Sequence, residues 1–209
     1  MKNDVTPAAK KIKKICVYCG SGPGNDPAYM AAAREFGAIL AQNKIGLVYG
    51  GGSVGIMGAV SDAVRDNGGD TLGIIPNFLV KREHAHPERD GLLMTSDMHE
   101  RKRMMFEKAD AFVALPGGIG TLEELVEQLT WIQLGRHKKP VVLANINGFW
   151  DPLCALIEHM RALEFIRAGL DFNLIIVERV QEILPRLHQA MAPVEPHEKE
   201  MKDAQPHQL

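Results

Sequence analysis

The alternation of short apolar runs with amphipathic runs constrains the fold of this chain more than any other feature. Apolar, often β-branched runs typical of strands cover residues 15–19, 45–49, 71–75, 91–95, 111–115, 141–144 and 174–177. Helical patterns lie between them, over residues 27–42, 54–66, 98–108, 122–134 and 150–165. Strands that are apolar on both faces are typical of parallel sheets covered by helices on two sides. The sequence therefore predicts a doubly wound α/β domain with a mostly parallel sheet.

The length and the two ends of the chain indicate a single domain. At roughly 150 residues per domain, 209 residues make one compact unit with short extensions. Residues 192–209 carry three prolines, mixed charges and few large apolar side chains, a composition typical of disorder. We expect one domain over residues 14–190, a flexible N-terminal extension over residues 1–13 and a disordered tail over residues 191–209.

Charge and hydropathy narrow the function classes. Lysine and arginine total 24 and aspartate and glutamate 26, a formal net charge of −2, without the basic excess of a nucleic-acid or membrane-surface binder. No apolar run approaches the roughly 18 residues that span a bilayer, and the run after the basic N-terminus is too short for a signal peptide. We expect a cytoplasmic enzyme or binding protein, with no nucleic-acid or membrane partner.

The cysteines and histidines do not form a convincing metal or redox site. Cys16 and Cys19 make a CxxC pattern, but no second ligand pair has the spacing of a zinc site. The pair also lies on a predicted strand, where positions three apart point to opposite faces. An odd count of three cysteines indicates a reducing compartment. We expect buried strand cysteines, an exposed loop at Glu83-His84-Ala85-His86, and no metal or cofactor.

The topology predicts where a site must lie. In a parallel sheet, the loop after each strand and the start of the next helix meet at the carboxyl edge, where ligands bind. Glycines and charged residues concentrate at these positions, over residues 20–24, 50–53, 76–83, 98–102 and 116–121. The candidate site is therefore this edge.

The first dense glycine cluster resembles a dinucleotide fingerprint only in part. Residues 50–55 satisfy GxGxxG between a predicted strand and a helix. NAD binding would also require an acidic residue at the end of the next strand, and that strand ends at Pro76 without one, while Asp70 lies at its other end. We interpret the cluster as a turn that lets a nucleotide or a neighbouring backbone come close.

The second glycine loop, residues 116–121, precedes a helix and supports two interpretations. Free backbone amides at a helix start can cradle an anion. Alternatively, Thr121 and Glu124 form a capping box that needs no ligand. Two carboxylates in the first turn would repel a phosphate unless cations lie nearby, and Arg101, Lys102 and Arg103 start the preceding helix at the same edge. Cradle, cations and acids together suit a phosphorylated substrate whose chemistry needs a carboxylate.

Two of these segments together resemble a known family. Residues 98–102, Met-His-Glu-Arg-Lys, followed by residues 116–124, Pro-Gly-Gly-Ile-Gly-Thr-Leu-Glu-Glu, closely resemble the paired signature of the LOG (LONELY GUY) family of cytokinin riboside 5′-monophosphate phosphoribohydrolases. The resemblance continues through residues 19–21, 49–58, 82–83 and 130–135, and covers about residues 14–190. Ile119 stands where many plant members carry tyrosine.

The resemblance implies a fold, an activity and a set of site residues. It implies a Rossmann-like homodimer that cleaves the N-glycosidic bond of adenine-type nucleoside 5′-monophosphates, such as AMP, to free base and ribose 5-phosphate, without a cofactor. It implies that Arg101 and Glu124 are the catalytic pair, and that the Gly117–Thr121 loop holds the phosphate. The substrate-binding residues that it implies are Ser21, Glu83, Met98, Lys102, Gly117, Gly118, Ile119, Gly120, Thr121, Glu123 and Thr130.

The residues favour the enzyme over two other functions. The loop and fold are also similar to those of molybdenum-cofactor carriers, which bind a phosphorylated pterin without turning it over, but the pairing of Arg101 with Glu124 favours catalysis. Relatives have been labelled lysine decarboxylases, yet no lysine here has the context of a pyridoxal phosphate Schiff base. Our hypothesis is that Glu124 stabilises an oxocarbenium-like sugar and activates water, while Arg101 positions the substrate and offsets the acids' charge.

Overall fold

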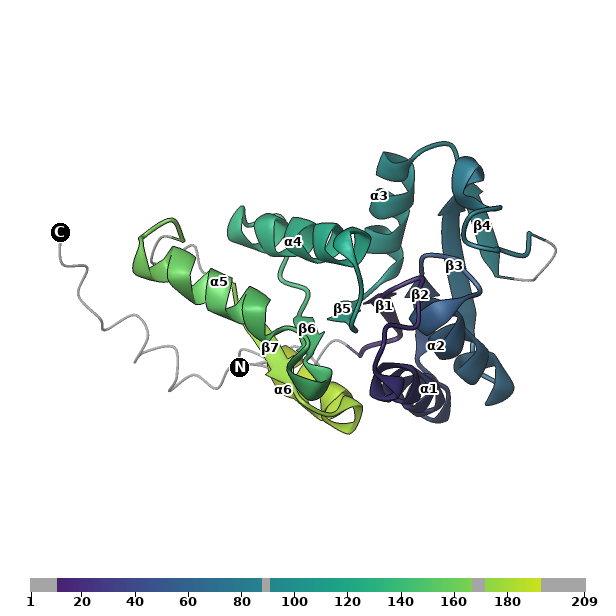
Figure 1. Ribbon diagram of the computed structural model, residues 1–209, viewed down its shortest axis with the longest axis horizontal. Coiled ribbons are helices and arrows are strands. Elements are labelled where there is room, and N and C mark those ends of the chain that lie inside the picture. The colour runs from purple at the N-terminus through teal and green to yellow at the C-terminus, as the bar shows by residue number, and fades with distance from the viewer. Residues whose placement is uncertain (1–10, 88–90, 167–171, 193–209) are drawn as a thin grey trace, which may run out of the picture.

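A seven-stranded sheet forms the centre of the molecule (Figure 1). The computed structural model describes residues 11–87, 91–166 and 172–192. The strand order is β4-β3-β2-β1-β5-β6-β7, and every neighbouring pair is parallel. The strands are β1 (Lys14–Tyr18), β2 (Gly46–Tyr49), β3 (Thr71–Pro76), β4 (Leu92–Thr95), β5 (Ala111–Ala114), β6 (Val141–Ala144) and β7 (Leu174–Val177). The predicted doubly wound α/β fold and all seven predicted strands are confirmed.

Helices cover both faces of the sheet. They are α1 (Pro27–Gln42), α2 (Gly55–Asp66), α3 (Met98–Lys108), α4 (Ile119–Gln133), α5 (Asp151–Ala162) and α6 (Ile183–Met191). One hydrophobic cluster joins α1, α2 and α6 to one face, and a second joins α3, α4 and α5 to the other (Figure 1). Each face of the sheet therefore has its own core, as expected of strands that are apolar on both sides.

Strand β1 shows how alternate residues supply the two cores. Ile15 and Val17 belong to the first cluster, whereas Cys16 and Tyr18 belong to the second. Cys19 returns to the first, so the two cysteines of the CxxC pattern point to opposite faces and both are free and buried. Burial raises the pKa of both thiols, which keeps them in the unreactive thiol form. The expectation of buried strand cysteines is confirmed.

Among the α-helices that the structure describes, the last is the one that the sequence patterns did not indicate. Helix α6 contains Pro185, which lowers any helical expectation, but the proline occupies the first turn, where its missing N–H costs nothing. Ile183, Leu184 and Leu187 are buried against the sheet. The expected N-terminal extension up to residue 10 and the expected tail from residue 193 lie outside the described residues. Within the described segments, no helix is long and apolar enough to cross a bilayer.

Helices α1 and α2 pack unusually closely, and Gly37 permits it. A Cβ atom at Gly37 would lie 2.5 Å from the Val60 carbonyl oxygen and 2.7 Å from the Ala63 Cβ. One of these atoms is a backbone oxygen and the other is a Cβ, so neither can move without the backbone of α2. The helices would have to separate to admit even one methyl group.

The Gly37→Ala variant should therefore lose about 1–3 kcal/mol of unfolding free energy, because overpacking a dense interface forces backbone shifts. Urea denaturation of the purified variant measures this loss. Ala31→Ser, on the exposed side of the same helix, should stay within about 0.5 kcal/mol of the unchanged protein. Equal stability of Gly37→Ala and the unchanged protein would contradict this account of the packing.

Candidate active site

The loops after β1 and β5 meet where the strand order reverses. These two strands are neighbours, and the chain proceeds outward from them in opposite directions, to β4 and to β7. The Gly20 amide donates to the Pro116 carbonyl oxygen at 3.1 Å. A Cβ atom at Gly117 would lie 2.7 Å from the Gly20 nitrogen and 2.2 Å from the Thr121 Oγ1, so no larger residue fits there. This meeting point is the topological switch, where ligands of open α/β sheets bind.

Helix α4 begins three residues earlier than predicted. Its N-cap is Gly118, no side chain caps it, and the Leu122 amide donates to the Gly118 carbonyl oxygen at 3.0 Å. The predicted capping box at Thr121 is therefore wrong, because the glycine loop continues directly into the helix and Thr121 lies within the first turn. Glu123 and Glu124 move to the second turn, and the first turn contains no acidic residue.

The start of α4 is suited to bind an anion. The amides of Ile119, Gly120 and Thr121 lie in the first turn, where no intrahelical acceptor exists. A Cβ atom at Gly118 or Gly120 would meet nothing within 4 Å, and Ile119 is 81% exposed. Open backbone amides at the positive end of a helix dipole form an anion cradle.

The start of α2, by contrast, is occupied by the protein itself. The Ile56 amide donates to the Gly22 carbonyl oxygen at 3.3 Å and the Met57 amide to the Gly20 carbonyl oxygen at 3.0 Å. Gly55 has a φ of 63°, and a Cβ atom there would lie 2.3 Å from the Ser21 carbonyl oxygen. The interpretation that this glycine cluster admits a neighbouring backbone is confirmed, and two amides of the first turn, those of Ile56 and Met57, already donate to protein carbonyl oxygens.

A buried ion pair lies beside the open cradle. Arg101 Nη1 and Glu124 Oε1 are 2.8 Å apart, and each residue is only 7% exposed. Arg101 Nε also donates to the Ile74 carbonyl oxygen at 3.0 Å, at the end of β3. Burial raises the pKa of Glu124, and the positive charge of Arg101 opposes the rise without cancelling it. Glu124 can therefore exchange a proton closer to neutral pH than an ordinary glutamate can.

A second set of ion pairs joins α3 to α4. Lys102 Nζ lies 2.5 Å from Glu123 Oε1 and 3.0 Å from Glu127 Oε1. Burial opposes the lysine's charge, but its two carboxylate partners outweigh burial and raise the pKa of Lys102. The two cations at the start of α3 thus balance acids of α4, as the sequence suggested for Arg101.

The remaining predicted substrate-binding residues fall into two groups. Glu83 lies against the loop after β2: its carbonyl oxygen accepts from the Ser53 amide at 3.1 Å, and its buried Oε2 has no hydrogen-bond partner among the described residues. Ser21, exposed, and Met98, half-buried, lie at the same sheet edge. Thr130 does not: its hydroxyl donates to the Val126 carbonyl oxygen of its own helix at 2.8 Å, about 9 Å along α4 from Glu124.

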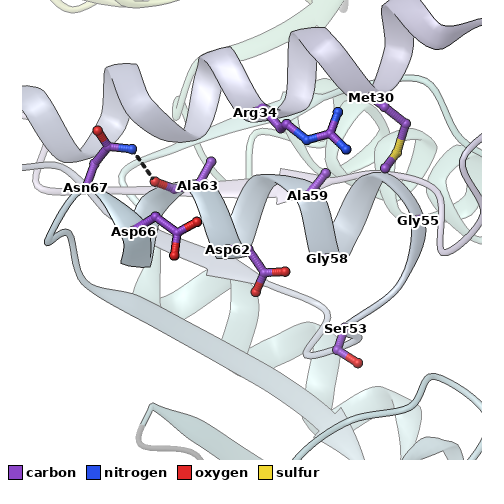
Figure 2. A pocket seen from close by; sticks show the side chains of 10 residues that line it. All are labelled: Met30, Arg34, Ser53, Gly55, Gly58, Ala59, Asp62, Ala63, Asp66 and Asn67. Carbon is purple, nitrogen blue, oxygen red and sulfur yellow. Dashed lines mark hydrogen bonds between the residues drawn. The ribbon is translucent and has the colours of Figure 1, made fainter.

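A groove of about 500 Å³ between α1 and α2 is separate from this site (Figure 2). Charged and polar side chains of the two helices line it, among them Arg34, Asp62 and Asp66. None of the predicted site residues lines the groove. Among the described residues, no group of three or more histidine, cysteine, aspartate or glutamate side chains could hold a metal ion.

Breaking the buried pair from one side should be costly. Arg101→Met leaves Glu124 without its counter-charge, which should cost about 3–5 kcal/mol of unfolding free energy at neutral pH. Burial holds the folded-state pKa of Glu124 above the unfolded value of about 4.3. The folded variant therefore binds the Glu124 proton more tightly than the unfolded chain does. Its free energy of unfolding falls as the pH rises from the unfolded-state pKa through the folded-state pKa of Glu124.

Denaturant unfolding at about pH 5 and about pH 8 measures the effect. Arg101→Met should lose less stability at the lower pH, and adding Glu124→Gln should recover part of the loss. The control Arg103→Met, on the exposed side of the same helix, should change stability by at most about 0.5 kcal/mol. A pH-independent loss in Arg101→Met would show that Glu124 is not the group left unpaired.

Comparisons with known proteins show which family this chain resembles. A family model described as "Possible lysine decarboxylase" matches residues 57–187. The chain is 46% identical over 179 residues to the cytokinin riboside 5′-monophosphate phosphoribohydrolase LOG of Oryza sativa subsp. japonica, covering 86% of this chain and 74% of that protein. It is 50% identical over 148 residues to a cytokinin riboside 5′-monophosphate phosphoribohydrolase of Arabidopsis thaliana, covering 71% and 68% respectively.

Solved structures share the fold at lower identity. The molybdenum-cofactor carrier protein of Chlamydomonas reinhardtii has a TM-score of 0.63 and 22% identity, covering 88% of this chain and 100% of that one. The molybdenum-cofactor binding protein of Rippkaea orientalis has a TM-score of 0.64 and 22% identity, covering 87% and 99%. These likenesses concern the fold alone. The sequence matches go further, and by them this chain belongs to the LOG family, which includes the cytokinin riboside 5′-monophosphate phosphoribohydrolases.

Proposed function

We propose that this protein is a hydrolase that cleaves the N-glycosidic bond of cytokinin riboside 5′-monophosphates, AMP or both, releasing the free base and ribose 5-phosphate. The observation that carries the proposal is the buried Arg101–Glu124 pair one helical turn from the open amides of α4. The relatives that match most of the chain bear the name of this activity. We further propose that it acts in the cytoplasm, since its described cysteines are free thiols.

The geometry of α4 suggests how the substrate is held. The amides of Ile119, Gly120 and Thr121 bind the 5′-phosphate at the helix start. Glu124 follows Thr121 by three residues, a rise of about 4.5 Å along the same helix. A ribose anchored by its phosphate at the first turn can therefore place its anomeric carbon near the second-turn carboxylate. Phosphate binding then contributes energy at a distance from the bond that breaks.

The reaction follows from this placement. As the bond between the anomeric carbon and the base nitrogen breaks, positive charge develops on the sugar, and the Glu124 carboxylate stabilises it. Glu124 takes a proton from the attacking water, whose oxygen bonds to the anomeric carbon. The departing base nitrogen takes a proton from solvent, and Glu124 returns its proton to solvent, so that one water is consumed overall. Arg101 holds the carboxylate in place through the 2.8 Å ion pair.

Substituting Glu124 tests the assignment. Purified protein incubated with AMP, or with an N6-prenylated AMP, should release free base and ribose 5-phosphate, detected by chromatography. Glu124→Gln should lower kcat by about 10²- to 10⁴-fold, because it removes the general base, while nucleotide binding measured by calorimetry is largely kept. The matched control Glu107→Gln, exposed on α3, should retain full activity.

The assay also separates the enzyme from a carrier of the same fold. Release of base by Glu124→Gln at the unchanged rate would refute the role of Glu124. A protein that releases no base from either nucleotide, yet binds a phosphorylated pterin, would be a carrier, the alternative that the structural likenesses raise.

The anion cradle can be tested separately with Gly118→Ala. A Cβ atom at residue 118 would meet no protein atom within 4 Å, so the backbone should be preserved while the methyl group hinders the phosphate. Loss of one charge-assisted hydrogen bond, about 1.5–3 kcal/mol, predicts a KM raised by about 10-fold or more. Inhibition by adenosine, which lacks the phosphate, should not change. An unchanged KM would contradict phosphate binding at this helix start.

We also propose that the active form is a homodimer, and the exposed side of α4 supports this. Ile119, Val126 and Leu134 are 81%, 43% and 69% exposed, and Thr130 lies among them. The resemblance gives Thr130 a substrate contact, yet in its own chain Thr130 lies about 9 Å along α4 from Glu124. A second copy packed on this apolar stripe would bring Thr130 to the neighbouring site.

Light scattering coupled to size exclusion tests the dimer. The protein should run at twice the chain mass, and Val126→Glu should yield monomers with strongly reduced activity, because a buried charge without a partner opposes association. The control Ala31→Glu, exposed on α1, should remain dimeric. A fully active monomer would contradict the proposal.

A further inference from the structure

The loop after β2 contacts the buried arginine, a role that the phosphate cradle does not explain. A Cβ atom at Gly50 would lie 2.3 Å from Arg101 Nη2, and 3.2 Å from both Sδ and Cε of Met57. Met57 is itself fixed under the loop, where its Sδ accepts from the Gly52 amide at 3.1 Å. At Gly50 there is therefore no room for a side chain between the backbone and the guanidinium of Arg101.

Three different elements enclose the guanidinium of Arg101. Its Nε donates to the Ile74 carbonyl oxygen of β3, its Nη1 pairs with Glu124 of α4, and its Nη2 lies against Gly50 after β2. Because the guanidinium is a rigid planar fork, contacts at all three nitrogens fix both its position and its plane. A methyl group added at Gly50 would displace Nη2 and turn the guanidinium out of this plane.

We propose that Gly50 is a positioning residue for the proposed reaction. Because glycine has no side chain, the space beside its Cα accommodates Arg101 Nη2 and keeps the guanidinium against Glu124; we call this space the socket. This inference rests on the proposed function for its kinetic consequence but not for its geometry. It assigns the first glycine cluster a purpose other than dinucleotide binding.

Gly50→Ala is a discriminating substitution because the fold can accept it. Gly50 is absent from the glycines with positive φ, in contrast to Gly51 at 81°, so alanine can adopt its backbone conformation. The nearest atoms that the new Cβ would meet all belong to the ends of two side chains, Arg101 and Met57, and none belongs to the backbone. The substitution should therefore move the guanidinium while the fold persists.

Nitrogen-15 NMR of arginine side chains reports directly on the environment of the Arg101 guanidinium. The Nε–Hε group of Arg101 is buried and hydrogen-bonded, so it should give a slowly exchanging resonance, assigned by its loss in Arg101→Lys. Gly50→Ala should shift this resonance and accelerate its exchange. Gly46→Ala, at the other end of β2, would meet nothing nearer than the Lys14 Cγ at 3.3 Å and should leave the resonance unchanged. An unchanged resonance in Gly50→Ala would overturn the proposal.

A double-mutant cycle tests the kinetic consequence. Gly50→Ala should lower kcat by about 10²-fold, the effect of a misplacement near 1 Å. In an Arg101→Lys background, which lacks Nη2, it should cost about threefold or less, because the two changes share one interaction. The acid limb of the pH profile should also move to higher pH in Gly50→Ala, because Glu124 loses part of the positive charge that restrains its pKa.

The outcomes separate this proposal from the proposed function. If Gly50→Ala lowered kcat equally in the unchanged protein and in Arg101→Lys, the effect would come from Met57 or the loop. That result would overturn the proposal that Gly50 positions Arg101. A moved Arg101 resonance in a protein that hydrolyses no nucleotide would support the socket and refute the hydrolase.

Discussion

The ion pair between Arg101 and Glu124 is the interaction on which the rest of the site depends. Taking two charges out of water is costly, and their attraction offsets the cost only with good geometry and further hydrogen bonds. Here the Ile74 carbonyl supplies one such bond, and Gly50 leaves room for the remaining nitrogen. The pair joins α3 to α4 on one face of the sheet. It leaves a carboxylate whose pKa is raised by burial, beside a helix start that can hold an anion.

Two glycine-rich loops at the same sheet edge have opposite uses. The amides of Ile56 and Met57 in the first turn of α2 donate to the carbonyl oxygens of Gly22 and Gly20, and the loop that precedes this helix approaches Arg101 at Gly50. The start of α4 lies open, with no acid in its first turn. The difference lies in what each helix start faces: α2 faces another loop of the chain, and α4 faces solvent. Similar glycine content therefore does not imply similar ligands.

Much of the fold could be predicted from the sequence, and less of the site. Apolar runs predicted every strand, and the rule that parallel strands end at one edge predicted where the candidate site lies, because both depend on patterns along the chain. The capping box failed because Thr121 and Glu124 have the right spacing, whereas the helix start was set by Gly118. No sequence signal marked Ile74, since it acts through its carbonyl oxygen. Gly50 lay in a glycine cluster that the sequence did mark, but nothing in the sequence linked it to Arg101. The pairing of Arg101 with Glu124 came from family resemblance, and the structure supplies its distance.

The proposed reaction requires the phosphate to bind at the start of α4 and the sugar to reach Glu124. A crystal structure of the Glu124→Gln variant with bound AMP tests it most directly. We expect the phosphate on the amides of Ile119, Gly120 and Thr121, with the anomeric carbon beside residue 124. A phosphate bound instead at the Gly50–Ser53 loop, or an anomeric carbon remote from residue 124, would contradict the account.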